Sequence, residues 1–485
     1  MWPIVEKTIQ FFRGWGRLLR PNLMKVIPEV TKAQSIASEA MAEKIGLWLQ
    51  MYRGEAPWIK KDTKSLGLPA IIATEVARLV TAEMEITCTG SEMAKFVDTM
   101  LEPMRAKARL VAEYACAGGG LIIKPCVGSE KIHPEFIHAD MFFPVAYNNS
   151  MKITTCFFVY RHFEGKKIYS RLEKHDLQGT TCTITNEAYV SYISSSLGKP
   201  CELSEVSEWA DIAPKTVVHN LDGPLYAYFS IPIGNTTDLD SPLGSSVYSR
   251  AVGLIQDADE QYGSLIWEYR AGEAAIDAPS DVFGIDEKGQ PKLPEGKERL
   301  FRLNEMDMAA TGGASELMKH WAPALRDGSY IAGLNRILCQ IEDACCLSRG
   351  TISDPALVAK TATEIKISKQ RSYTLVSDIQ SSFQTALDDY VYAVKALASL
   401  YNMAPFGNVT TQYHWDDSII QDTDAEKMMD QQEVAQGLMQ KWEYRVKWYG
   451  ETEQQAKKVL GAEQSDEEIL FGDNTPPEEN EPDEE

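Results

Sequence analysis

The 485-residue sequence contains no long run of apolar residues. A helix that crosses a bilayer needs about 20 consecutive apolar residues, and no stretch approaches that length, so we expect no membrane span. The N-terminal segment 1–23 mixes aromatic residues with Lys7, Arg13, Arg17 and Arg20, and its charges interrupt it too often for a signal peptide. We predict an amphipathic surface helix there, with contact to a membrane surface as the alternative.

The nine cysteines lack the spacing of a metal site or a disulfide framework. Their number is odd, and no two are separated by the two-residue gap of a zinc ribbon. A chain of this length has enough apolar material for a core without disulfides, so we interpret the cysteines as free intracellular thiols. Cys345 and Cys346 fall at the end of an apolar helical stripe, where packing is the plain interpretation.

Basic residues are scarce. Lys and Arg total 48 against 70 Asp and Glu, which gives a net charge of −22. Eleven of these acids lie in 463–485, a segment with no Lys or Arg that we expect to be a disordered, solubilising tail. A sequence-specific DNA-binding protein normally carries a basic footprint, because phosphate neutralisation supplies much of its affinity. A protein of this composition that handles DNA should do so without holding it tightly.

Motifs for nucleotide binding and catalysis are also missing. Residues 118–120 are three glycines, but no Gly-Lys-Ser/Thr follows, so they predict a tight turn into a strand rather than a P-loop. His133 and His138 are five residues apart and are interpreted as loop residues, while Glu173 and His175 are interpreted as strand surface. We expect no cofactor, no metal site and no catalytic residue.

The patterns that are present predict an α+β fold that is mainly helical. Residues 24–112 carry apolar stripes at helical spacing. Strands are then predicted by alternation between turn residues; they are 121–123, 142–146, 153–161, 167–174, 181–186 and 216–219.

Three further helices follow a polar linker at 235–246. The first spans 246–270 and the second 327–347, with Asp327 as its expected cap. The third, 361–403, has no Gly or Pro before Asn402, and Thr361 with Glu364 reads as a capping box. Its length of about 60 Å exceeds a typical domain, so we expect neighbouring subunits to bury it. A last helix is predicted to start at Thr452, with Gln455 in the capping-box position.

The order of these parts resembles the portal proteins of tailed bacteriophages, of the siphophage type. The similarity covers about 24–462, and no single stretch carries it. The residues on which it depends are Pro224 to Phe229, Pro232 to Asn235, Ser241 to Ser246 with the helix after it, the loop-rich insert, the second helix, and the long helix that opens with Lys360 to Ile365.

This resemblance implies a division of the chain into named parts. A wing of α+β structure would span 24–240, followed by two stem helices on either side of a clip. A tunnel loop would then precede a long kinked helix, and a helical crown would come before the tail. The expected ranges are stem 246–270 and 327–347, clip 272–326, tunnel loop 350–359, long wing helix 361–403, crown 414–462 and tail 463–485. Trp415, Trp442 and Trp448 would pack within the crown; stacking on bases is the alternative.

The resemblance also implies a non-enzymatic function. Such a subunit forms a ring of about twelve copies at a capsid vertex and is a conduit for double-stranded DNA during packaging and ejection. Implied partners are the large terminase subunit, a head-completion or adaptor protein, and the major capsid and scaffolding proteins. The implied location is the virion, with the host cytoplasm during assembly. Another minor head or capsid protein, or a metal-dependent nuclease, are the alternatives.

Four groups of residues follow as candidates for this function. Weak or repulsive walls suit a channel through which DNA slides, and Asp257, Glu260 and Glu268 could supply them. The candidate DNA-channel loop is Gly350, Thr351, Ile352, Ser353, Asp354, Pro355 and Ala356. Loose phosphate contacts, or equally paired surface charges, are expected at Lys360, Lys366 and Lys369. The expected stem interface is Leu254, Ala258, Tyr262, Leu265, Leu334, Leu338 and Ile341.

Overall fold

The computed structural model describes most of the chain and divides it into two compact units. The described residues are 23–60, 63–82, 84–128, 131–279, 300–304, 319–354, 362–415 and 423–460. Unit 1 is Met1–Trp415 and unit 2 is Asp416–Glu485. The expected N-terminal amphipathic helix, the capping residue Thr361 and the acidic tail lie outside the described residues.

The first part of unit 1 is helical. The helices are α2 (Leu23–Thr31), α3 (Glu39–Tyr52), α4 (Leu68–Thr81), α5 (Glu92–Met100) and α6 (Glu102–Gly118). Ser38 and Ser91 cap α3 and α5, each accepting a hydrogen bond from a backbone N–H of the first turn. Their apolar stripes are buried, as at Met41, Ile72 and Val97.

One strand interrupts this helical region, so the prediction of helix throughout 24–112 is wrong. Strand β1 (Met84–Thr89) pairs antiparallel with β14 (Thr410–Trp415), more than 300 residues later. Within β1, Ile86 and Cys88 are buried and their neighbours are exposed, which is the two-residue period of a strand. Trp415 therefore belongs to unit 1.

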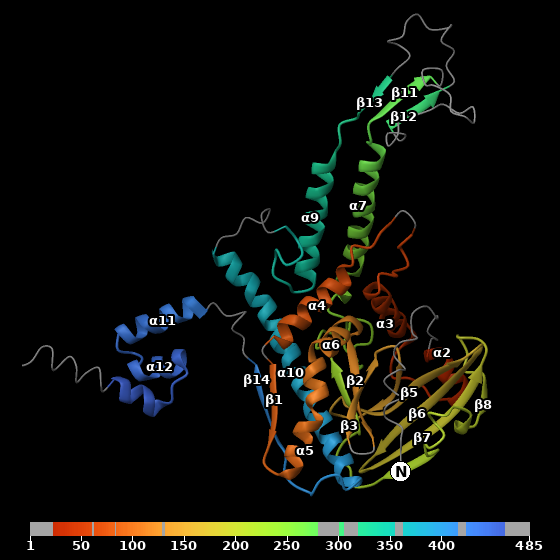
Figure 1. Cartoon of the computed structure of the whole chain (residues 1–485), viewed down its shortest axis with the longest axis vertical. Helices are drawn as coiled ribbons and strands as arrows, with labels where there is room; N and C mark the ends of the chain where they lie inside the picture. Colours follow the sequence, from red (N-terminus) through yellow and green to blue (C-terminus); the bar gives the residue numbers. More distant parts are fainter. Residues whose placement is uncertain are drawn as a thin grey trace, which may run out of the picture. The chain divides into compact units, whose positions relative to one another are not determined.

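Two sheets form the middle of unit 1 (Figure 1). One is three-stranded, in the order β10-β2-β3; its strands are β2 (Gly120–Val127), β3 (Ile132–His138) and β10 (Ala227–Ser230). The other is a six-stranded antiparallel sheet in the order β4-β5-β6-β7-β8, with β9 also paired to β7; its strands are β4 (Phe142–Tyr147), β5 (Ile153–Glu164), β6 (Lys167–Gln178), β7 (Thr181–Ser191), β8 (Lys199–Cys201) and β9 (Lys215–Val218).

The glycines at 118–120 form the predicted turn into a strand. Helix α6 ends at Gly118, Gly119 caps it in the left-handed region with φ of 86°, and β2 begins at Gly120. A Cβ atom on Gly119 would lie 2.6 Å from the carbonyl oxygen of Gly244. Only glycine fits both this backbone conformation and this close approach.

Helix α10 (Ala362–Leu400) is one α-helix of 39 residues, as its lack of Gly and Pro predicts. It packs against β10, β2, α4 and α5, and Phe383 stacks on Phe229 at 4.5 Å between ring centroids. From Val376 to Ala398 its apolar stripe is buried by unit 1 itself. The expectation that neighbouring subunits are needed to bury this helix is therefore wrong for its described side chains.

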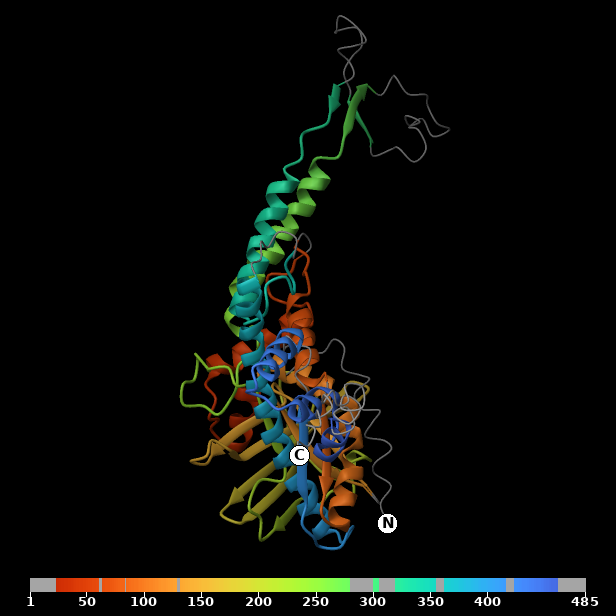
Figure 2. The same ribbon diagram turned by 90° about the vertical axis from the view of Figure 1, so that its left-hand side faces the viewer.

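A pair of helices and a small sheet complete unit 1. Helix α7 (Val252–Ala271) and helix α9 (Asp327–Ala344) lie side by side (Figure 1, Figure 2). Between them in sequence come β11 (Ala275–Pro279), β12 (Phe301–Asn304) and β13 (Lys319–Trp321), which form one sheet in the order β12-β11-β13. Residues 280–299 and 305–318 of the expected clip lie outside the described residues.

Unit 2 is helical in its described part. It contains α11 (Thr423–Ala435), α12 (Lys441–Tyr449) and a further helix at 453–460. The capping box at Thr452 is confirmed, since Gln455 Oε1 accepts from Thr452 N at 3.1 Å and Thr452 Oγ1 from Gln455 N at 3.4 Å. Asp430 joins the helices through Lys447 Nζ at 2.6 Å and Trp448 Nε1 at 2.7 Å.

Candidate functional site

The helix pair α7–α9 buries only part of its apolar surface within the chain. The expected stem interface divides accordingly: Ala258, Leu265 and Ile341 are buried, and Leu254, Tyr262, Leu334 and Leu338 are half-buried. The helices approach closely at Gly333, where a Cβ atom would lie 3.4 Å from Gln261 Nε2.

Large apolar side chains on the same pair face solvent. Trp267 is 65% exposed and Ile331 is 45% exposed, and Tyr269 is also exposed. Exposed apolar side chains that recur along one helix pair mark an interaction surface more often than a solvated face. The pair therefore has the character of an element that another chain covers.

Glu268 anchors the two helices to each other. Its carboxylate accepts from Arg326 Nη2 at 2.8 Å, from Arg326 Nε at 3.1 Å and from the Arg326 backbone N–H at 3.2 Å. These hydrogen bonds lower the pKa of Glu268. The charge of Glu268 is thereby paired with that of Arg326. The expectation that Asp327 caps α9 is wrong, because Arg326 occupies the cap position and Glu268 accepts from its N–H.

A second buried carboxylate on α7 holds a loop. Asp259 is 1% exposed, and its oxygens accept from Trp58 Nε1 at 2.9 Å and from the Leu66 backbone N–H at 2.7 Å. Burial raises the pKa of Asp259, and these two hydrogen bonds oppose that shift. Trp58 and Leu66 are thereby both fixed to α7.

The beginning of the candidate channel loop is tied to α9. Glu342 of α9 is fully buried, and its Oε1 accepts from the backbone N–H groups of Ile352 at 2.7 Å and Ser353 at 2.9 Å. Its Oε2 accepts from Ser353 Oγ at 2.7 Å and from the Gly350 N–H at 3.2 Å. We call this arrangement the Glu342 clamp.

Of the other candidate residues for the DNA channel, some lie among the described residues and some lie outside them. Thr351 and Asp354 are exposed, and the Asp354 N–H donates to Asn335 Oδ1 at 2.8 Å. Lys366 and Lys369 lie on α10, but their side chains are not among those described. Pro355, Ala356 and Lys360 lie outside the described residues.

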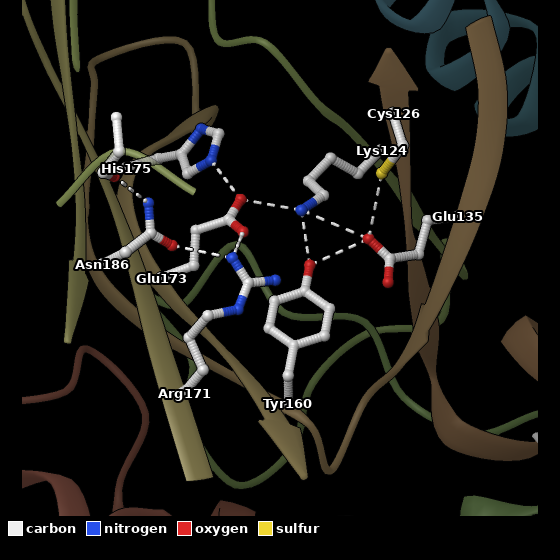
Figure 3. Close-up of polar contacts among 9 residues, drawn as sticks. Lys124, Cys126, Glu135, Tyr160, Arg171, Glu173, His175 and Asn186 are labelled. Carbon is white, nitrogen blue, oxygen red and sulfur yellow. Dashed lines mark hydrogen bonds and ion pairs between the residues drawn. The ribbon is translucent and has the colours of Figure 1, made fainter. Parts of the chain in front are cut away.

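A buried cluster of charges joins the two sheets, and the sequence patterns did not reveal it (Figure 3). Lys124 of β2 donates to Glu173 of β6 at 2.7 Å and also bonds to Tyr160. Arg171 donates to the other oxygen of Glu173 at 3.0 Å, and His175 Nε2 lies 2.8 Å from Glu173 Oε1. The interpretation of Glu173 and His175 as strand surface is wrong, since they are 8% and 4% exposed.

The cluster continues onto β3. Glu135 lies 3.2 Å from Lys124 Nζ, accepts from Tyr160 at 2.8 Å and is contacted by Cys126 Sγ at 3.3 Å. The interpretation of residues 133–138 as a loop is therefore wrong, because they form β3. Among the described residues, no group of three or more His, Cys, Asp or Glu side chains is placed to hold a metal ion.

The charges of the cluster stabilise one another. Burial alone would raise the pKa of Glu173, but Lys124 and Arg171 outweigh it and hold that pKa well below its ordinary value. Burial alone would lower the pKa of Lys124, but Glu173, Tyr160 and Glu135 outweigh it and raise that pKa. Both groups are therefore ionised at neutral pH, as buried pairs with good geometry are.

A family model identifies the chain. The model described as "Phage portal protein, SPP1 Gp6-like" matches residues 70–468, which is most of the sequence. The chain is thus a phage portal protein, a structural protein of the head-tail connector of the virion. Within that class it belongs to the SPP1 Gp6-like family. No curated protein sequence matches the chain.

Two solved structures contain chains of similar fold. One, "Neck of native GTA particle computed with C12 symmetry", is 11% identical with a TM-score of 0.35. The other, "Neck of empty GTA particle computed with C6 symmetry", is 13% identical with a TM-score of 0.37. Each match covers 87% of this chain and 98% of the other. At these TM-scores the family model, and not the structures, supports the assignment.

Among the described residues, no helix has the length and apolar character that crossing a bilayer requires.

Proposed function

We propose that this portal protein assembles into a homo-oligomeric ring of about twelve copies, through which double-stranded DNA enters and leaves the capsid. The observation that carries the proposal is the helix pair α7–α9. Several of its apolar side chains, such as Leu254, Leu334 and Trp267, are half-buried or exposed, whereas the apolar stripe of α10 from Val376 to Ala398 is buried within unit 1. Side-by-side packing of the same pair from neighbouring copies would cover that surface.

In this proposal α7 and α9 are the stem helices, and the β11–β13 sheet with its connections is the clip. The structure up to β10 and helix α10 form the wing, and unit 2 is the crown. The proposed partners of the ring are the large terminase subunit, a head-completion or adaptor protein, and the major capsid and scaffolding proteins. The subunit itself is not an enzyme, and it passes through the host cytoplasm before it joins the virion.

Residues 350–356 are proposed to face the DNA, with Lys360, Lys366 and Lys369 as loose phosphate contacts. The net charge of −22 supports a conduit that binds DNA weakly, because each phosphate contact would add a barrier to sliding. Of the three wall acids expected from the sequence, Asp257 and Glu260 are exposed and Glu268 is paired.

Native mass spectrometry and electron microscopy of the purified protein test the ring. We expect a closed ring of about twelve subunits with a central channel. A stable, folded 54.2 kDa monomer at micromolar concentration would refute the proposal. Packaging of double-stranded DNA in vitro with the terminase tests the conduit: wild-type rings should support packaging, and rings that assemble but never admit DNA would contradict it.

A further inference from the structure

The Glu342 clamp has a feature that helix packing does not explain. A carboxylate with no exposed surface is costly to bury unless its oxygens are fully hydrogen-bonded. Glu342 meets this requirement with three backbone N–H groups and one hydroxyl, all from residues 350–353. The charge and the turn therefore depend on each other: the turn stabilises the carboxylate, and the carboxylate determines the path of the turn.

The other side of the connection is anchored on the same end of α9. Ser372 Oγ of α10 lies 2.9 Å from Ser348 Oγ and 3.3 Å from the carbonyl oxygen of Cys346. Arg371 lies 3.5 Å from Asp343, which also pairs with Arg349 at 2.7 Å. The chain thus leaves the end of α9 through one anchored turn, and helix α10 later contacts the same end of α9.

Charge-assisted hydrogen bonds to backbone N–H groups are about twice as strong as neutral ones. Three of them, with a fourth bond from the Ser353 hydroxyl, fix the direction in which the chain leaves α9, and Thr351 and Asp354 are exposed. In a ring, the same clamp in every copy would place these residues at one height.

We propose that Glu342 is a positioning residue of the DNA conduit, which holds residues 350–353 in one place so that every subunit presents the same turn. This inference rests on the proposed conduit function. Glu342 acts through the turn and does not itself touch DNA.

The test compares Glu342→Gln and Glu342→Ala with Glu43→Gln as the matched control. Glu43 is an exposed glutamate of helix α3, outside the helix pair and the channel loop. In Glu342→Gln an NH₂ group replaces one carboxylate oxygen, so this donor faces at least one backbone N–H donor and that hydrogen bond is lost. Glu342→Ala removes all four hydrogen bonds. Hydrogen exchange of a peptide covering 348–354 reports on the clamp, while electron microscopy reports on the ring and an in-vitro terminase assay on DNA packaging and retention.

We expect all three variants to form rings. Exchange in 348–354 should accelerate roughly tenfold or more in Glu342→Gln, since loss of one charged hydrogen bond costs more than a factor of ten. Packaged or retained DNA should fall several-fold in that variant, fall further in Glu342→Ala, and stay unchanged in Glu43→Gln.

Two results would overturn the inference: unchanged exchange in both Glu342 variants, or faster exchange with normal packaging and retention. If Glu342→Ala failed to assemble, Ser353→Ala decides by the same measurements, because it removes the hydroxyl bonds to Glu342 and from the Gly350 N–H but keeps the backbone N–H bonds to Glu342. Failure of the wild-type ring to package DNA would instead refute the proposed function, and that result does not involve the variants.

Discussion

Buried charges define this structure at the residue scale. Lys124 and Glu173 come from different sheets, and both side chains are buried where they meet. Removing one partner of such a pair leaves the other charge buried and uncompensated, which is more destabilising than losing the pair together. The cluster therefore specifies how the three-stranded sheet docks on the six-stranded sheet.

The Glu173→Gln variant tests this role. It keeps the shape of the side chain but leaves Lys124 and Arg171 without their shared charge, so we expect a loss of about 3–5 kcal/mol in the free energy of unfolding. Glu164→Gln, at the exposed end of β5, is the control and should change stability by less than about 0.5 kcal/mol. Chemical denaturation measures both, and equal stability of the two variants would contradict the role of the cluster.

His175 gives the cluster a dependence on pH. Burial lowers its pKa, against the opposing effect of Glu173. Its Nδ1 atom is buried without a hydrogen-bond partner among the described residues, so a second ring proton would have no acceptor. An unfolded histidine takes up that proton below about pH 6.5, and the folded one does so only at lower pH.

Stability should therefore fall as the pH drops below about 6.5, because the unfolded state binds the extra proton first. Stability should fall further below the ordinary glutamate pKa of about 4.3, because the unfolded state then protonates Glu173 before the folded state does. His175→Gln should flatten the first decrease and leave the second. Melting temperatures measured between pH 8 and pH 5 check this, and an unchanged slope in the variant would exclude His175 as the source.

At the element scale, the two long helical features differ in what buries them. Helix α10 lies against β10, β2, α4 and α5 of its own chain. The pair α7–α9 has one mutual interface and a second, partly apolar surface with Trp267 and Ile331 exposed. The first element stabilises the subunit, and the second is the surface that we propose for assembly.

The double variant Trp267→Ser, Ile331→Ser should separate folding from assembly. Both side chains are exposed in the subunit, and substitutions of exposed residues usually change the free energy of unfolding by less than about 0.5 kcal/mol. The melting temperature of the subunit should therefore stay within about 2 °C of the wild type. Ring formation should be weakened, with smaller species visible in native mass spectrometry. Leu239→Ser, an 84% exposed leucine outside the helix pair, is the control. Complete rings of the double variant at sub-micromolar concentration would exclude this surface.

At the scale of the whole molecule, acidic charge is concentrated at the C-terminus. The segment 463–485 carries eleven acids and no base, and 473–485 contains three prolines. Such a composition has little apolar surface to bury.

Truncation after Gly472 should accordingly leave ring formation and the melting temperature nearly unchanged. Electron microscopy and thermal unfolding of the truncated protein measure this. A truncated chain that no longer assembles would show that the tail is part of the structure of the ring.

The sequence by itself determined the elements whose signals are local. The absence of Gly and Pro predicts helix α10, glycine at 119 predicts the turn into β2, and Thr452 with Gln455 predicts a cap. The ordered set of such parts was also enough to indicate the portal family. These features could be predicted because each depends on residues within a few positions of one another.

Only the tertiary structure decided the contacts between distant segments. Neither Met84–Thr89 nor Thr410–Trp415 shows in its own sequence that the two segments pair as strands. The short strand β1, six residues long, was therefore predicted as part of a helical region. Glu173, His175 and Glu342 are polar residues that look like surface in a linear pattern. They are buried because partners from other strands and turns satisfy their hydrogen bonds, and those partners become neighbours only when the chain folds.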